Sequence, residues 1–162
     1  MGQRRCPNRA CNAHVFVAWQ PPAQILVSYP AERLDFDSSN IPTPIVATFE
    51  EALTCHANAC FAAAAMMVRK TLEQLCDDRG ASGKTLHERL AALRGKVILP
   101  DALFGALDPL RLLGNDAAHV ESKTYNDVGK NEVEVGISLA KEVLKAVYQY
   151  DSLLGQLNAL KK

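Results

Sequence analysis

The chain has 162 residues, of which 48% are hydrophobic and 22% charged, a composition that excludes a chain disordered throughout. Eighteen basic residues balance eighteen acidic ones, so the sequence lacks the broad positive field of a general nucleic-acid binder. No apolar run approaches the roughly 20 residues that span a bilayer, and no secretory signal follows the first arginines. We therefore expect a cytoplasmic protein with no membrane partner, whose five cysteines are thiols or metal ligands.

Residues 1–44 are predicted to form an extended, β-prone N-terminal arm. This segment holds six of the eight prolines, and proline removes a backbone donor and interrupts helices. The runs 14–19 and 24–29 are β-prone, and Gln20-Pro21-Pro22-Ala23 separates them. The pattern is compatible with a small hairpin or with two edge strands.

Cys6-x4-Cys11, followed by His14, places three candidate zinc ligands in the arm. Structural zinc takes four thiolate or imidazole ligands in a tetrahedron. Cys76, Cys55 or another subunit would have to supply the fourth ligand of such a site. The alternative interpretation is three unliganded side chains on the arm, with no cofactor.

The chain is predicted to be an all-α protein, in which the N-terminal arm carries short strands and residues 45–162 form an antiparallel bundle of two long and two or three shorter helices. Apolar residues three, four or seven apart predict one long helix from about Thr48 to Gly80. Thr85-Leu86-His87-Glu88 predicts a capping box at the start of a short helix that stops at Gly95. Asn131 is expected to cap a long C-terminal helix, whose apolar stripe is Val133, Ile137, Ala140, Leu144, Val147, Leu154 and Leu157.

Two polar motifs lie on these predicted helices. Cys55-His56-x3-Cys60 repeats the spacing of the first cysteine pair, but it is interpreted as core because Cys60 falls on the apolar stripe. Asp108-Pro109 predicts a further helix start, and continuation of that helix would align Arg111, Asn115 and His119 at i, i+4 and i+8.

A guanidinium, an amide and an imidazole on one face would suit metal-independent cleavage of RNA through the ribose 2′-hydroxyl. Arg111 would bind the phosphate, Asn115 would orient a group, and His119 would act as general acid or base. Gly114-Asn115 is also a helix-stop signal, and under that alternative His119 lies in a loop and bonds the backbone.

The sequence resembles a bacterial family, domain-of-unknown-function family 4145, over nearly its whole length. The most specific parts are the Arg-Lys-x-Leu-Glu element and the Gly-Asn-x-Ala-Ala-His element. The residues that carry the resemblance are Cys6-Pro7, Tyr29-Pro30, Pro44, Glu51-Ala52, Ala65 to Glu73, Gly83-Lys84-Thr85-Leu86 and Gly114-Asn115-Asp116-Ala117-Ala118-His119.

That family is similar to the HEPN superfamily of helical, commonly dimeric domains, and it occurs with restriction-modification and defence modules. The resemblance implies a homodimer, an RNA or nucleotide ligand or a defence-system protein partner, and His119 as the HEPN histidine. Gly114 stands where HEPN ribonucleases carry arginine, and the nearest arginine, Arg111, is eight residues from His119. We therefore expect a non-catalytic binding module first, a metal-independent endoribonuclease second, and a structural dimerisation or adaptor domain third.

Overall fold

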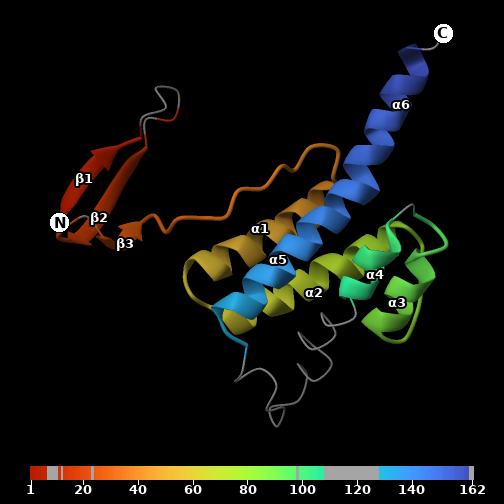
Figure 1. Ribbon diagram of the computed structural model, residues 1–162, viewed down its shortest axis with the longest axis horizontal. Helices are drawn as coiled ribbons and strands as arrows, with labels where there is room; N and C mark the ends of the chain where they lie inside the picture. Colours follow the sequence, from red (N-terminus) through yellow and green to blue (C-terminus); the bar gives the residue numbers. More distant parts are fainter. Residues whose placement is uncertain (7–10, 12, 23, 98, 108–127, 161–162) are drawn as a thin grey trace. The chain divides into compact units, whose positions relative to one another are not determined.

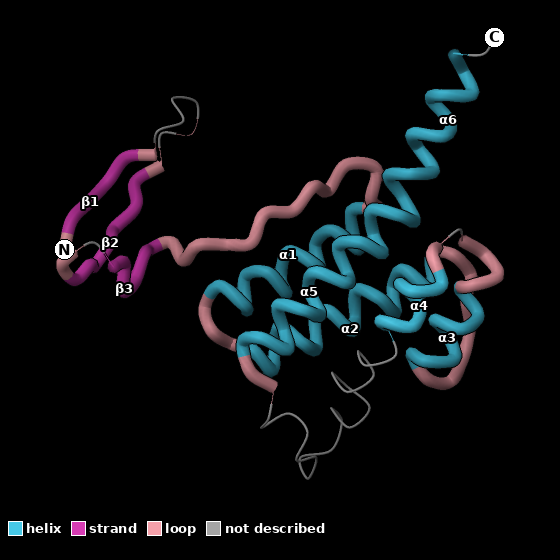
Figure 2. Tube along the Cα trace, in the orientation of Figure 1, coloured by secondary structure: helices cyan, strands magenta, loops and turns pink. Residues whose placement is uncertain are grey.

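The chain divides into two compact units, Met1–Leu34 and Asp35–Lys162, in a computed structural model. The structure describes residues 1–6, 11, 13–22, 24–97, 99–107 and 128–160. Figure 1 follows the chain by colour, and Figure 2 separates helices from strands. The prediction of an all-α protein is wrong, because the first unit is a three-stranded antiparallel sheet and only the second is helical.

The sheet contains β1 (Gly2–Arg5), β2 (His14–Gln20) and β3 (Gln24–Tyr29) in the order β1-β2-β3. The two β-prone runs pair as an antiparallel hairpin, as one of the two alternatives predicted. Sequence patterns missed β1, which has no β-branched or aromatic residue. It is a strand because its backbone pairs with β2, and Gly2 leaves room for Trp19: a Cβ at Gly2 would lie 2.9 Å from that ring.

The helical unit is built on three long helices that lie side by side in Figure 1: α1 (Thr43–Ala57), α2 (Phe61–Asp78) and α5 (Lys130–Leu144). Two short helices pack against them, α3 (Leu86–Leu93) against α2 and α4 (Asp101–Leu107) against α5. Their facing sides bury a continuous apolar core. Its largest fully buried side chains are Phe49, Leu53, Val68, Leu72, Leu75, Leu93, Val133, Ile137, Val143, Leu144 and Val147.

The predicted single helix from Thr48 to Gly80 is instead a hairpin of α1 and α2. Residues 58–60 break it, because Ala59 adopts a positive φ of 58°. Asn58 Nδ2 donates to Thr54 O at 2.9 Å, and the Cys60 N–H donates to Cys55 O at 2.9 Å. Alanine is a strong helix former, and its presence does not indicate a left-handed turn. Because the helical spacing of apolar residues continues across residues 58–60, the sequence predicted one helix where the structure has two.

Local capping followed the sequence at one helix and departed from it at another. Thr85 caps α3, and its hydroxyl accepts the Glu88 N–H at 3.2 Å, as predicted. The Glu88 carboxylate accepts from Lys84 N rather than from Thr85 N. At α5 the N-cap is Gly129 and not Asn131, because Glu132 reaches back to the Gly129 N–H at 3.0 Å.

The C-terminal segment is one continuous helix of three parts. α5 leads into a π-helical turn, η3 (Lys145–Gln149), and then into α6 (Tyr150–Leu160). Figure 1 shows α6 continuing beyond the ends of the neighbouring helices. The long C-terminal helix that the sequence predicts is therefore confirmed, and it carries the surface described next.

Candidate functional site

The predicted catalytic stripe, Arg111, Asn115 and His119, falls within residues 108–127, which lie outside the described residues. The predicted helix start at Pro109 lies there as well. Their convergence on one face, and the general acid–base chemistry that would follow from it, therefore stay predictions.

The three candidate zinc ligands of the N-terminal unit are all described. Cys6 is half-buried and its N–H donates to Ala13 O at 2.8 Å, while Cys11 is exposed. His14 lies on the sheet, where Gln3 Nε2 donates to its Nδ1 at 2.6 Å. No three His, Cys, Asp or Glu side chains gather as a metal-binding group within the described part of the chain, so the zinc site stays a prediction.

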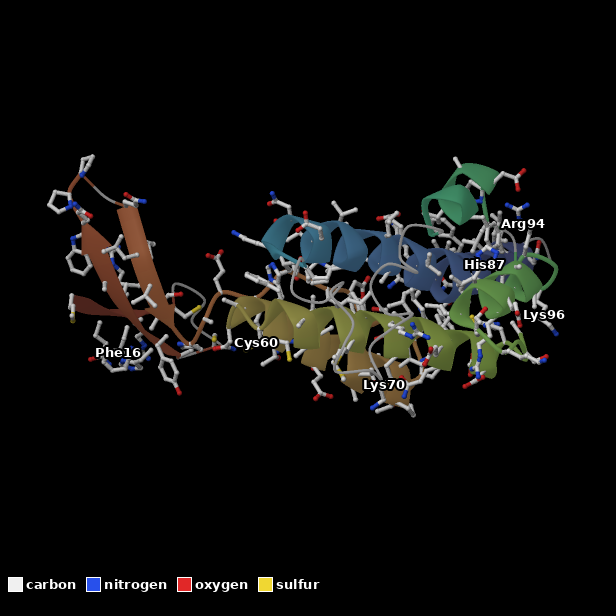
Figure 3. All side chains as sticks on the ribbon, turned by 90° about the horizontal axis from the view of Figure 1, so that it is seen from below. Phe16, Cys60, Lys70, His87, Arg94 and Lys96 are labelled. Atoms are coloured by element: carbon white, nitrogen blue, oxygen red, sulfur yellow. The ribbon has the colours of Figure 1, made fainter. Side chains whose placement is uncertain are left out.

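The second polar motif contains a buried histidine that bonds a distant helix. His56 on α1 has a side chain 8% exposed, and its Nε2 donates to Glu134 Oε1 on α5 at 3.1 Å. The prediction that Cys60 packs in the core is wrong, because Cys60 is the exposed N-cap of α2 at the turn labelled in Figure 3. Sequence spacing gave no sign of the His56–Glu134 pair, whose partners are 78 residues apart.

The start of α6 is fixed to the bundle by the π-helical turn. Tyr148 in η3 is buried, and its hydroxyl donates to Asp78 Oδ2 at 2.8 Å. The Arg79 guanidinium lies over the Tyr148 ring, 4.5 Å from its centroid, and also donates to Val147 O at 3.1 Å. Gln149 Nε2 donates to Asp37 O at 3.1 Å, in the segment before α1. These bonds hold the π-helical turn, and with it the start of α6, against the rest of the helical unit.

The same contacts change how Tyr148 titrates. Burial is the main cause that raises the pKa of the Tyr148 hydroxyl, and the bond to the Asp78 carboxylate raises it further. The hydroxyl therefore stays protonated over the neutral range and remains a donor to Asp78. The anchor of α6 is thus a neutral donor on a charged acceptor.

Beyond its first turn, α6 has no packed face among the described residues. From Ser152 to Leu160 no side chain is buried, and Leu153, Leu154, Leu157 and Leu160 are 58%, 52%, 51% and 84% exposed. The apolar stripe predicted for the C-terminal helix therefore continues through Leu154 and Leu157, where its side chains are exposed. We call this surface, Leu153, Leu154, Leu157 and Leu160, the leucine face.

A shallow hollow lies along the outer side of α5, on the same continuous helix. It has a volume of about 450 Å³, and Val135 within it is 60% exposed. The hollow is lined by Asn131, Glu134, Val135, Ser138, Leu139 and Glu142. The C-terminal helix therefore presents exposed apolar side chains both before and after the π-helical turn.

The chain was compared with known protein families, curated proteins and solved structures. The model of the family "Domain of unknown function (DUF4145)" matches residues 50–162. The chain belongs to this family. The matched range includes the leucine face and excludes the N-terminal sheet. Neither curated proteins nor solved structures gave a match. Among the described helices, none is both long and apolar enough to cross a membrane.

Proposed function

We propose that this DUF4145 chain is a non-catalytic association module, in which the leucine face of α6 packs against the same face of a second copy. One observation carries the proposal: the turn before α6 is anchored at Tyr148, and α6 then carries four leucines that are each more than half exposed. Exposed leucines scattered singly need no explanation, but a contiguous stripe on one helix marks an interaction surface.

The size of the leucine face fits the apolar centre of a small interface. From the exposed fractions of the four leucines, the face offers roughly 400 Å² of apolar surface per copy, within the range of functional patches. A specific interface buries about 800 Å² per partner. Tyr150, 45% exposed in the first turn of α6, adds a further exposed apolar side chain to the same helix.

A second copy is the occupant that the chemistry of this face favours. A two-fold interface needs a patch that is complementary to itself. The sequence of α6 contains a single charged residue, Asp151 in its first turn, so the leucine face brings no like charges together at its centre. Because the whole chain has a net charge of zero, long-range repulsion does not oppose its self-association.

The wider expectation, a HEPN-like dimer that binds RNA, a nucleotide or a protein partner in bacterial defence, depends on the resemblance described above. The leucine face supports only the association part of it. Two copies held along their C-terminal helices would form the homodimer in which HEPN-like domains work.

The test is the oligomeric state of the purified chain, measured by sedimentation velocity between about 1 and 100 µM. We expect a dimer for the unchanged chain and a monomer for Leu157→Glu, because the substitution places a carboxylate at the centre of the apolar contact. Ala159→Glu is the matched control. It adds the same charge two residues further along the same exposed helix, about 200° around from Leu157, and it should remain dimeric.

Leu157 is half exposed, so the variant should fold, and circular dichroism and urea unfolding of the monomer check this. A chain that is monomeric at 100 µM overturns the proposal. Equal dimerisation of the Leu157 and Ala159 variants overturns it as well, because the contact would then lie elsewhere.

A further inference from the structure

One face of the N-terminal sheet carries a row of side chains from all three strands. Gln3 lies directly opposite Phe16, and Phe16 lies directly opposite Tyr29. Residues directly opposite one another in an antiparallel pair project from the same face, with Cβ atoms about 5 Å apart. The side chains of Phe16 and Tyr29 therefore project from neighbouring positions on one face of the sheet, with the amide of Gln3 at the edge of the row.

The next row toward the β1–β2 connection adds polar groups to the same face. Arg5 pairs with His14 in register, and the His14 ring accepts a hydrogen bond from Gln3. We call these five residues, Gln3, Arg5, His14, Phe16 and Tyr29, the aromatic row. A hollow of about 360 Å³ borders it, and its lining includes Gln3, Phe16 and Tyr29 of the row together with Ala18 and Val27.

The two rings are open to solvent. Phe16 is 54% exposed and Tyr29 is 76% exposed, and Figure 3 shows Phe16 on the side of the sheet. Every nucleobase has a π-face that can stack on an exposed aromatic ring. Gln3 supplies amide groups, and Arg5 a guanidinium that pairs with phosphate through several N–H donors.

Charge separates this unit from the rest of the chain. Residues 1–34 contain four arginines and one glutamate, a net charge of +3. Residues 35–162 contain 14 basic and 17 acidic residues, a net charge of −3. The overall neutrality that argued against nucleic-acid binding is thus the sum of a basic unit and an acidic one, and the basic unit holds the exposed rings.

We propose that the aromatic row is a binding site for single-stranded nucleic acid, with Phe16 and Tyr29 stacking on successive bases and Arg5 contacting the phosphate between or beside them. The sheet lies outside the residues matched by the family model, so the site belongs to this chain's own N-terminal unit. Duplexes bind less well, because their bases are stacked on one another and are not available to the rings.

The experiment is a fluorescence-anisotropy titration of the full chain with labelled 12-nucleotide strands, at 50 and 200 mM KCl. RNA and DNA strands of one sequence distinguish the two nucleic acids, and the corresponding duplexes test for strand selectivity. Phe16→Leu and Tyr29→Leu should each raise the Kd for single strands by at least fivefold, because leucine keeps an apolar side chain but cannot stack. Phe16→Trp should keep the affinity, and Arg5→Gln should lower the slope of log K against log salt by about one.

Trp19→Leu is the matched control on the same strand. Trp19 lies on the opposite face of the sheet, over Gly2, so its loss should change the Kd less than twofold. Circular dichroism shows whether each variant keeps the sheet. Leu157→Glu should bind a 12-nucleotide strand as the unchanged chain does, which separates this test from that of the proposed dimer.

Absence of single-strand binding at 100 µM chain and 50 mM KCl overturns the proposal. So does equal affinity of the Phe16→Leu variant and the unchanged chain, which would indicate either a site elsewhere or a surface that receives an apolar protein partner. Equal losses for the Phe16 and Trp19 variants also contradict it, because stacking on one face cannot produce them.

Discussion

Cys76 on α2 is fully buried, and its burial raises the pKa of its thiol from 9.0 to about 12. The nearby Arg89 guanidinium opposes this shift but does not cancel it. The folded pKa lies above the unfolded one, so the neutral thiol contributes its full stability below pH 9. This contribution is lost as pH rises toward 12, because the unfolded chain releases the proton first.

The expected loss follows from the two pKa values. At pH 10 an unfolded thiol is about 90% ionised while the buried one is still neutral, which costs about 1 kcal/mol of folding free energy. Urea unfolding at pH 7 and pH 10, in reductant, measures the loss for the unchanged chain and for Cys76→Ala. We expect the unchanged chain to lose about 1 kcal/mol more than the variant between the two pH values.

Cys60→Ala is the control, because Cys60 is an exposed thiol in the same unit. It should keep the pH dependence of the unchanged chain. The reasoning is refuted if Cys76→Ala loses as much stability between pH 7 and 10 as the unchanged chain does. In that case another group accounts for the alkaline loss and the thiol of Cys76 is not shielded in the native state.

Two further substitutions test the local structure of the helical unit by urea unfolding at pH 7. Ala59→Gly should stabilise the chain by about 0.5 kcal/mol. Glycine removes the steric strain of the positive φ, and this gain outweighs the added conformational freedom of the unfolded backbone. A loss of stability would contradict the left-handed turn. Tyr148→Phe should cost about 1–2 kcal/mol, because it leaves Asp78 without its hydroxyl donor; a neutral result would mean that water replaces that donor.

The helical unit was largely predictable because its signals are local. Apolar residues at helical spacing identified α2 and α5. Thr85 marked the start of α3, because its hydroxyl bonds the backbone N–H of Glu88, only three residues further along the chain. The break at Ala59 was not predictable, because alanine has no preference for a positive φ and this exposed turn is held by local hydrogen bonds from Asn58 and Cys60. Propensity alone therefore fused α1 and α2.

The sheet was harder to predict than the helices, because strand pairing depends on residues that are distant in the sequence. β2 and β3 contain β-branched and aromatic residues and were found as strands, whereas β1 has no such signal and exists only through pairing with β2. Because β1 was missed, Gln3 and Arg5 could not be placed beside Phe16. The aromatic row is a property of register, and register between strands is not visible in any single segment.

The leucine face shows that one apolar pattern can continue from a buried part of a helix into an exposed part. Leu144, Leu154 and Leu157 follow the same helical period, yet Leu144 is fully buried and the other two are half exposed. Apolar residues at helical spacing indicate only that this side of the helix packs against another apolar surface. The spacing does not indicate whether that surface belongs to the same chain or to another. The helices of this chain cover the stripe as far as Val147. Past the anchor at Tyr148 the same pattern continues without a described partner, and the proposed second copy provides the missing half of the packing.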